Sequence, residues 1–361
     1  MGDPVRAEQV LDVLRQVKDP DLHKDIVELG FVKDVQIAAG DVAFTIELTT
    51  PACPVREQME TQARQLVSAL PGVRSVQVKM TAMVRSMAGA QGTELAGVKN
   101  LVAVASGKGG VGKSTVAVNL ALALLADGAR VGLLDADIYG PSIPIMMGTR
   151  DTPPGARGNQ ILPVQAHGLA MMSIGFLAGQ EAPIIWRGPM VHKMASQVLA
   201  NVSWGELDYL IIDLPPGTGD AQLTLTQSAP LSGAVIVTTP QDVALEDVHR
   251  GVRMFEQVNV PILGIVENMS YFACPSCGHR EDIFSHGGGK RAAAKYEVPF
   301  LGEVPILPAI RAAGDRGLPI VAAEPDSEAA QAFRAVARAT AAQLSTLAFR
   351  RGASRPTIKF S

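Results

Sequence analysis

The stretch that most constrains this chain is a glycine-rich run between an apolar segment and an alanine- and leucine-rich one. Residues 107–115 read Gly-Lys-Gly-Gly-Val-Gly-Lys-Ser-Thr, which fits the spacing G-x-x-x-x-G-K-[S/T]. A β-branched run at 101–105 precedes it, and a helical pattern extends from Ser114 to about Ala126. A strand, a glycine loop and a helix in this order are the context in which the spacing predicts a phosphate-binding loop, or P-loop.

The residue types of this loop suit a nucleoside triphosphate. Glycines let successive backbone N–H groups turn inward as a nest for an anion, and the N-terminus of a helix adds a partial positive charge. Lys113 can reach the β- and γ-phosphates, and the hydroxyl of Ser114 is placed to bind Mg²⁺. We therefore expect ATP to be bound by the whole stretch, which consists of Gly107, Lys108, Gly109, Gly110, Val111, Gly112, Lys113, Ser114 and Thr115.

Length and composition point to a soluble protein with two folded units. The chain has 361 residues, of which 47% are apolar and 19% charged, as in globular proteins. A net charge of −3 provides no global basic field to attract nucleic acid or an anionic membrane. No apolar run approaches the roughly 20 residues of a membrane span, and the first residues lack a signal-peptide pattern. We expect a cytoplasmic protein with no nucleic-acid or membrane partner.

Periodicity divides the chain into two domains and a linker. Residues 1–86 predict a small α+β domain, 87–97 a flexible linker, 98–347 a P-loop domain and 348–361 a tail. In the small domain we expect helices over 7–17 and 55–70 and strands over 32–38, 42–48 and 73–80. In the P-loop domain we expect strands over 101–105, 130–134, 169–173, 207–212, 233–238, 262–266 and 300–304. Helices are expected there over 114–126, 191–200, 221–228, 243–258 and 326–347, and a surface loop over 150–160.

The alternation of strands and helices in the larger domain predicts its fold class. It is typical of an α/β domain with a mostly parallel, doubly wound sheet. Two of its predicted strands end in acidic residues: Asp135 and Asp137 follow one, and Asp213 follows another. Because ligands of such sheets bind at the carboxyl ends of the strands, we expect these carboxylates beside the P-loop. Asp213 after an apolar run is typical of a Walker B residue that holds Mg²⁺.

The three cysteines favour metal or thiol chemistry over a disulfide framework, because they are few and odd in number. Cys274 and Cys277 have the C-x-x-C spacing of half a tetrahedral thiolate site. Two chains would supply four thiolates, which matches a [4Fe–4S] cluster on the two-fold axis of a homodimer. Zinc in the same geometry, with His279 as a further ligand, and a redox pair are the alternatives. Cys53, in a turn before a predicted helix, is either a reactive thiol or a buried apolar side chain.

A second lysine, Lys108, directly follows the first glycine of the loop. In this feature the chain resembles the MinD/ParA/nitrogenase-iron-protein class of P-loop ATPases, which has a deviant Walker A motif. The resemblance implies ATP hydrolysis by a nucleotide-sandwich homodimer, with Lys108 reaching the partner's phosphates and Lys113 acting within its own chain. It also implies that Asp135 and Asp213 serve the Mg²⁺ shell and that Asp137 orients the attacking water.

Further stretches resemble the Mrp/ApbC iron–sulfur cluster carriers. These are Trp186–Met190, Trp204–Leu210, Asp213–Asp220, Glu267–Gly278 and Phe284–Gly289. The first domain, with Thr49-Thr50-Pro51-Ala52-Cys53-Pro54, resembles the small domain fused to many such carriers and found alone in cluster-assembly factors.

This second resemblance implies a function. It implies an ATP-dependent carrier that holds a [4Fe–4S] cluster between Cys274 and Cys277 of two chains and transfers it to apoproteins, with cluster scaffolds as further partners. Asn268 matches a position that contacts the adenine base in related ATPases. The alternative is a MinD/ParA-like positioning or partition ATPase with a structural zinc site. Those ATPases lack a match to the C-x-x-C motif, and Gly352 and Pro356 disfavour a long amphipathic helix at the end of the chain.

Overall fold

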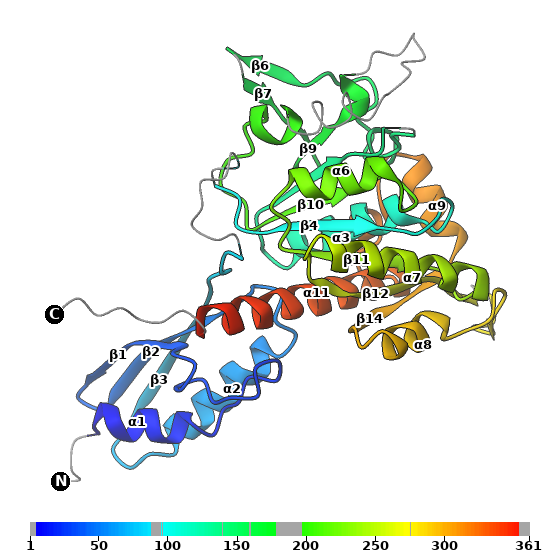
Figure 1. Ribbon diagram of the computed structural model, residues 1–361. Helices are drawn as coiled ribbons and strands as arrows, with labels where there is room; N and C mark the ends of the chain where they lie inside the picture. Colours follow the sequence, from blue (N-terminus) through cyan, green and yellow to red (C-terminus); the bar gives the residue numbers. More distant parts are fainter. Residues whose placement is uncertain are drawn as a thin grey trace. The chain divides into compact units, whose positions relative to one another are not determined.

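The strand that precedes the glycine loop is a central strand of a large sheet in the computed structural model (Figure 1). Strand β4 (Leu101–Ala105) is buried at every position. It pairs in parallel with β10 (Tyr209–Asp213) on one side and with β11 (Gly233–Thr238) on the other. Its continuous apolar sequence reflects a strand covered on both faces. The structure describes residues 5–87, 95, 97–138, 140–158, 160–177, 197–274 and 276–353.

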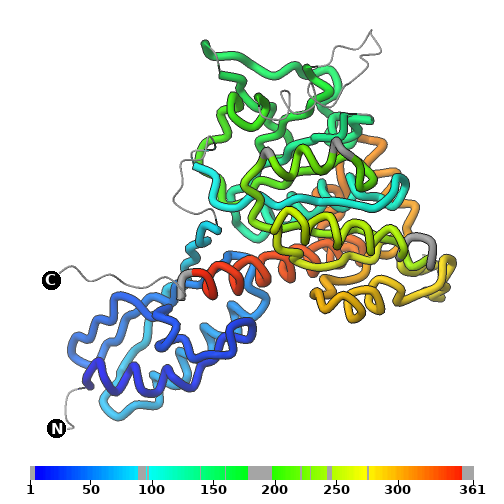
Figure 2. The backbone as a smooth tube through the Cα atoms, viewed as in Figure 1, coloured from blue at the N-terminus to red at the C-terminus, as the bar shows by residue number. Residues whose placement is uncertain are grey.

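The order of the strands confirms the mostly parallel, doubly wound sheet. It is β13-β12-β11-β4-β10-β5-β9-β8, with β14 pairing with β12 beside this path. Figure 2 shows these segments, which are distant in the sequence, side by side. β8 and β13 pair antiparallel with their neighbours at the two ends. The further strands of this sheet are β5 (Val131–Asp135), β8 (Val164–Ala166), β9 (Leu169–Ser173), β12 (Ile262–Ala273), β13 (Arg280–Glu281) and β14 (Phe300–Ile306).

The helices cover both faces of the sheet, and the change of face locates the ligand site. Helix α3 (Lys113–Ala126) leads from β4 towards β5, whereas α6 (Asp220–Ser228) and α7 (Asp242–Gln257) lead in the opposite direction across the sheet. Because parallel crossovers are right-handed, the two sets lie on opposite faces (Figure 1). The direction reverses at β4, so the glycine loop lies at the position where such sheets bind ligands.

The remaining helices of this sheet domain are short, apart from the last one. They are α4 (Ile143–Met146), the 3₁₀ helix η1 (Ile174–Phe176), α8 (Gly288–Lys295), α9 (Pro308–Asp315), α10 (Ile320–Ala323) and α11 (Glu328–Ala353). Helix α3 is rich in Ala and Leu, which are good helix formers, and it is buried along most of its length. Its burial explains why its sequence lacks a polar face.

Several elements differ from those expected from periodicity. The helices α8 and α9 were not expected, and residues 150–160 are only partly a loop, because β6 (Gly155–Arg157) pairs with β7 (Gln160–Leu162). Strand β12 continues seven residues beyond the expected end at Val266. Helix α11 extends to Ala353, so the tail expected from residue 348 begins with helix. Residues 191–196 of the helix expected over 191–200 and most of the linker over 87–97 lie outside the described residues, whereas residues 197–200 are helical as expected.

A second, smaller sheet contains three strands. β1 (Val32–Ala38) and β2 (Asp41–Leu48) form an antiparallel hairpin, and β3 (Ser75–Ala82) pairs with β2 in parallel. Helix α2 (Arg56–Ser68) provides the crossover between β2 and β3, and α1 (Ala7–Leu14) precedes them. Apolar side chains of all these elements form one core. This is the small α+β domain.

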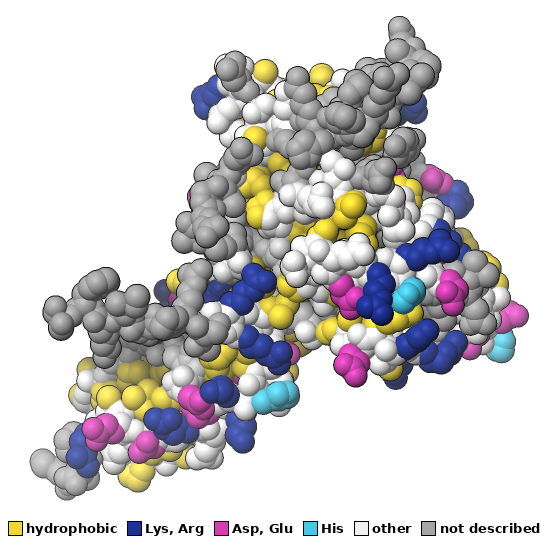
Figure 3. Space-filling model, in the orientation of Figure 1, with side chains coloured by type: hydrophobic (Ala, Val, Ile, Leu, Met, Phe, Trp, Pro, Cys, Tyr) yellow, Lys and Arg dark blue, Asp and Glu magenta, His cyan; other side chains and the backbone are white. Residues whose placement is uncertain are grey.

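The described chain divides into two compact units. One contains residues up to Arg85 together with the last part of α11 from Ala341, and the other extends from Ser86 to Thr340. No helix among the described residues is long and apolar enough to cross a membrane. Figure 3 shows Lys and Arg side chains interspersed with acidic ones on the face that carries α7 and α8. On α7, Arg250 pairs with Asp247 and Arg253 with Glu256.

Candidate functional site

The glycine loop is shaped by close approaches of the surrounding chain. Gly110 and Gly112 have φ angles of +80° and +79°, which side-chain-bearing residues rarely adopt. A Cβ atom at Gly107 would lie 2.4 Å from the carbonyl oxygen of Asp247 on α7. A Cβ atom at Gly112 would lie 2.2 Å from Nδ2 of Asn268. The fold itself therefore requires glycine at positions 107 and 112.

Three of the expected site residues meet at the start of α3. Nζ of Lys113 lies 2.6 Å from Oδ1 of Asp213, and the hydroxyl of Ser114 donates to Oδ2 of the same carboxylate at 2.5 Å. Asp137 lies beside them, with Oδ2 3.8 Å from the Lys113 ammonium. Lys113 and Asp213 are buried, so this ion pair is shielded from water. Hydroxyl and carboxylate oxygens are the ligands that Mg²⁺ prefers, and this donor set fits that ion.

Asp135 lies at the carboxyl end of β5, beside Asp213 at the end of β10, but has different hydrogen-bond partners. Its carboxylate accepts hydrogen bonds from the Ser173 hydroxyl at 3.0 Å and from the backbone N–H groups of Asp137 and Ile143. Burial, reinforced by the nearby charge of Asp213, raises the pKa of Asp135 to about 7. Burial also raises the pKa of Asp213, although Lys113 and Ser114 oppose this shift. The site thus holds more carboxylates than its one buried lysine neutralises.

Lys108 is separate from this buried group. Its side chain is partly exposed, while its backbone carbonyl accepts a hydrogen bond from the Ser106 hydroxyl. Among the residues that the structure describes, the Lys108 ammonium forms no ion pair. This lysine therefore does not belong to the charge cluster around Lys113.

A cavity of about 640 Å³ lies beside the end of the loop. Gly112, Thr115, Asn268 and the charged residues Arg311 and Asp315 line its polar part, and Nδ2 of Asn268 donates to the carbonyl of Val111 at 2.8 Å. Its volume is in the range of cofactor pockets. The other walls are mostly apolar and include Met146, Met269, Phe272, Ile283, Pro305, Ile306, Leu307, Pro308 and Ile310.

The two cysteines of the C-x-x-C motif lie in a tight turn at the end of β12. The N–H of Cys274 donates to the carbonyl of His279 at 2.9 Å, and the N–H of Gly278 donates to the carbonyl of Cys274 at 2.8 Å. β13 then returns along β12, with Arg280 opposite Ala273. The strand expected to end at residue 266 is β12, which extends to Ala273, so the motif directly follows the strand. We call residues 272–283 the cysteine hairpin.

The turn favours the thiolate form of one cysteine. Cys274 is partly buried, Cys277 is exposed, and neither is in a disulfide. Hydrogen bonds from the backbone N–H groups of Ser276 and Cys277 lower the pKa of the Cys274 thiol. Since the thiolate is the metal-binding form, the turn is suited to metal ligation. Cys53 lies in the other unit, before α2, where it packs against the small core.

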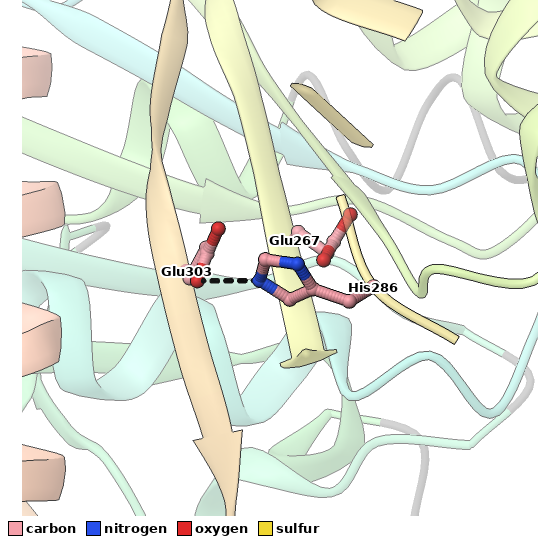
Figure 4. A group of neighbouring side chains, drawn as sticks. All are labelled: Glu267, His286 and Glu303. Carbon is pink, nitrogen blue, oxygen red and sulfur yellow. Dashed lines mark hydrogen bonds and ion pairs between the residues drawn. The ribbon is translucent and has the colours of Figure 1, made fainter. Parts of the chain in front are cut away.

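Beyond the hairpin, Glu267, His286 and Glu303 come together from three segments (Figure 4). Nε2 of His286 lies 3.1 Å from Oε2 of Glu303. The guanidinium of Arg280 lies 2.7 Å from the same histidine nitrogen, 3.6 Å from Glu303, and 3.7 Å above the centre of the Tyr271 ring. We call Arg280, His286 and Glu303 the hairpin clamp.

Glu267, which lies beside His286 and Glu303 in Figure 4, has partners of its own. Glu267 is fully buried and accepts hydrogen bonds from the hydroxyl of Ser270 and from the backbone N–H groups of Gly287 and Gly289 at the start of α8. Its charge is thus stabilised by the N-terminus of the helix. Because Glu267 is satisfied in this way and Arg280 neutralises Glu303, the group is an ion-pair and helix-capping network, and its charges require no metal ion.

The periodicity of the sequence predicted neither the apolar cavity nor the hairpin clamp. The segment from Pro305 to Asp315 carries no motif, and it joins the site only because β14 pairs with β12. The proline-rich sequence after an expected strand was the one available signal of a turn at the strand end. Among the stretches compared with known carriers, Trp186–Met190 lies outside the described residues.

Two family models match the sequence. The model of NUBPL iron-transfer P-loop NTPases matches residues 97–341, and that of iron-sulfur cluster assembly proteins matches residues 7–80. The chain is 52% identical to an iron-sulfur cluster carrier protein of Synechocystis sp. over 348 residues, which cover 94% of this chain and 98% of that one. It is 51% identical to a protein of the same name from Deinococcus radiodurans, over 93% of this chain and 95% of that one.

Solved structures resemble the larger unit. A nucleotide-binding protein from Archaeoglobus fulgidus, in complex with ADP, is 43% identical with a TM-score of 0.57, covering 62% of this chain and 88% of that chain. The cell division ATPase MinD of Pyrococcus furiosus is 24% identical with a TM-score of 0.51, covering 66% of this chain and 97% of that chain. At that identity the likeness to MinD concerns the fold alone.

Proposed function

Because the chain belongs to the family of NUBPL iron-transfer P-loop NTPases, we propose that it is an ATP-dependent iron–sulfur cluster carrier. In this proposal a [4Fe–4S] cluster is the cargo, held by Cys274 and Cys277 of two chains and passed to apoproteins. The observation that carries the proposal is the turn at the end of β12, which presents both cysteines and lowers the pKa of the Cys274 thiol. The names of the two bacterial relatives support the same role.

ATP is the proposed nucleotide, bound by Gly107–Thr115. The backbone N–H groups of the loop surround the phosphates and Lys113 neutralises their charge, while the base enters the apolar cavity beside Asn268. The ADP complex of the Archaeoglobus fulgidus protein supports nucleotide binding. Ser114, Asp213 and Asp135 are the residues that would hold Mg²⁺, which would neutralise phosphate charge.

Hydrolysis requires a positioned water and charge at the γ-phosphate, with little covalent chemistry by the protein. We assign water positioning to Asp137, which is buried beside Lys113. We assign the second lysine, Lys108, to the phosphates of a partner chain, so that the complete enzyme is a homodimer. The Lys108 side chain is partly exposed and its ammonium forms no ion pair within the described part of the chain, which supports this role. The further proposed partners are apo iron–sulfur proteins and cluster scaffolds, and the proposed location is the cytoplasm.

The test is anaerobic reconstitution with iron and sulfide, followed by transfer to an apoprotein that needs a [4Fe–4S] cluster. Iron, sulfide and zinc are quantified per chain. We expect four iron and four sulfide per homodimer, and loss of the brown chromophore in a Cys274→Ala/Cys277→Ala variant. A Cys53→Ala variant is the matched control, because its thiol lies in the other unit. One zinc per homodimer, bound by the four motif cysteines, with no iron retained, would overturn the proposal in favour of a zinc site.

ATP hydrolysis is tested separately. We expect Lys108→Ala to lower turnover more than about tenfold while each chain still binds ADP, since the lost contact belongs to the transition state. An unchanged turnover would remove Lys108 from the mechanism. A variant that hydrolyses normally but cannot transfer its cluster would separate the two activities.

A further inference from the structure

The cysteine hairpin forms part of the wall of the cavity that we assign to the nucleotide base. Phe272 of β12 and Ile283, which follows β13, both line this cavity. Cys274 lies two residues after Phe272, directly beyond the end of β12. The base pocket and the cysteines are therefore built on one short piece of chain.

The hairpin is held together by its own backbone. Phe272 pairs with Glu281 and Ala273 with Arg280, and the turn is closed by the hydrogen bond from Cys274 to the carbonyl of His279. A ligand in the cavity that contacts Phe272 and Ile283 would therefore contact both arms of the hairpin that carries Cys274 and Cys277.

The returning arm of this hairpin is anchored at Arg280 and exposed at Ile283. The hairpin clamp fixes β13, because Arg280 reaches Tyr271, His286 and Glu303. Ile283, by contrast, is an apolar side chain with 50% of its surface exposed at the cavity. An apolar ligand surface placed there would bury Ile283 and gain the corresponding hydrophobic free energy.

We propose that the base of the bound nucleotide packs against Phe272 and Ile283 and thereby orders the cysteine hairpin within a single chain. This inference rests on the nucleotide binding proposed above. Nucleotide occupancy and metal occupancy of the cysteines are then coupled without any change at a dimer interface. Because coupling is reciprocal, a metal on the cysteines raises the affinity for nucleotide by the same factor. Ile283 is a positioning residue for the cysteines.

Hydrogen exchange of the hairpin amides is the direct test. The backbone N–H groups of Cys274 and Gly278 close the turn, so their exchange rates report its opening. With saturating ADP, and at a concentration where the protein is monomeric, we expect these rates to fall about fivefold or more, the lower end of ordinary coupling between sites. Unchanged rates in the ADP complex would overturn the proposal.

Three variants localise the effect. In Ile283→Ala, ADP should no longer slow the hydrogen exchange of the turn amides, while the glycine loop remains protected by ADP. In Ile283→Val, which keeps a branched apolar side chain, ADP should again slow the exchange of these amides. Ile145→Ala is the matched control, because Ile145 is also exposed (45%) but does not line the cavity. Equal slowing in Ile283→Ala and in the wild type would also overturn the role of this residue.

The outcome separates this inference from the proposed function. If ADP protects neither the glycine loop nor the hairpin, the nucleotide site itself is wrong. If ADP protects the glycine loop alone, the proposed nucleotide site is correct and the proposed packing of the base against Phe272 and Ile283 is wrong. Co²⁺, whose thiolate complexes absorb visibly, provides the reciprocal measurement: its loading should raise ADP affinity in the wild type and in Ile145→Ala, and not in Ile283→Ala.

Discussion

Nζ of Lys113 lies 2.6 Å from Oδ1 of Asp213, in a buried position at the start of α3. A phosphate that engages this lysine must therefore compete with the carboxylate for the same ammonium group. The Mg²⁺ proposed here would change this competition, because it would draw on the negative charge of Asp213. In the proposed site the pair would thus link phosphate binding to the metal.

Asp213→Asn tests this competition. Without Mg²⁺ we expect ADP to bind about tenfold more tightly than to the wild type, because hydrogen bonds to charged groups contribute about 1.5–3 kcal/mol and Lys113 is freed. With Mg²⁺ we expect the gain to vanish and ATP turnover to be lost. Calorimetric titration with ADP in EDTA and then in Mg²⁺ measures both. Asp208→Asn, whose carboxylate pairs instead with Lys99, is the control. Weaker metal-free binding by Asp213→Asn would contradict the interpretation.

Asp135 provides a pH-dependent signature of metal binding. Its pKa is raised to about 7 by burial and by the charge of Asp213. Mg²⁺ favours the ionised carboxylate, so binding of Mg²⁺–ADP should release about one proton at about pH 6 and almost none at about pH 8.5. Titrations in buffers of different ionisation enthalpy measure this release. Asp135→Asn should abolish it, and release that persists in this variant would assign the proton to another group.

The same shift has a consequence for folding. Because the pKa of Asp135 in the folded chain lies above its ordinary value of 3.8, the folded state binds the proton more tightly than the unfolded state. Its contribution to the free energy of unfolding is therefore greatest at low pH and falls as the pH rises from about 4 to about 7. The penalty above that range is the free-energy cost of ionising a buried carboxyl group.

Two glycines of the loop should respond differently to alanine. A Cβ at Gly112 would lie 2.2 Å from Nδ2 of Asn268, and the residue has a φ of +79°. We expect Gly112→Ala to lower the free energy of unfolding by about 1–2 kcal/mol from the backbone conformation alone, with the displaced Asn268 adding to the loss. Gly109→Ala is the matched control, since a Cβ there meets nothing within 4 Å. Denaturant titration of both proteins without nucleotide is the measurement, and equal losses would contradict the structure.

The glycine loop and the C-x-x-C motif could be predicted because their chemistry resides in contiguous residues. The strand, loop and helix around Lys113 are local, and their order alone indicates a phosphate site. Asp213 was predictable because an acidic residue after an apolar run has a characteristic position in such sheets. The buried ion pair of Asp213 with Lys113 was not predicted, because it depends on the parallel pairing of β10 with β4.

The cavity wall could not be predicted in the same way. Ile283 and Ile306 are ordinary apolar residues, and nothing in their local sequence indicates that they line one cavity with Gly112. They do so because β12 extends to Ala273 and pairs with both β13 and β14. Met269, with a φ of +55°, interrupts the regular strand, so periodicity ended the strand too early. Long-range pairing and an irregular strand are the features that local patterns miss.

The last prediction concerns Arg280, whose guanidinium lies over Tyr271 and beside His286 and Glu303. Arg280→Met keeps much of the apolar stem and removes the charge. Since a half-exposed ion pair contributes at most about 1 kcal/mol, we expect the amides of the cysteine turn to exchange about two- to fivefold faster. Co²⁺ affinity at the cysteines should fall by a similar factor, because a looser turn must be ordered when the metal binds. Arg253→Met on α7, which breaks an exposed pair with Glu256, is the control. Faster exchange with unchanged Co²⁺ affinity would mean that the clamp stabilises the fold and does not position the thiolates.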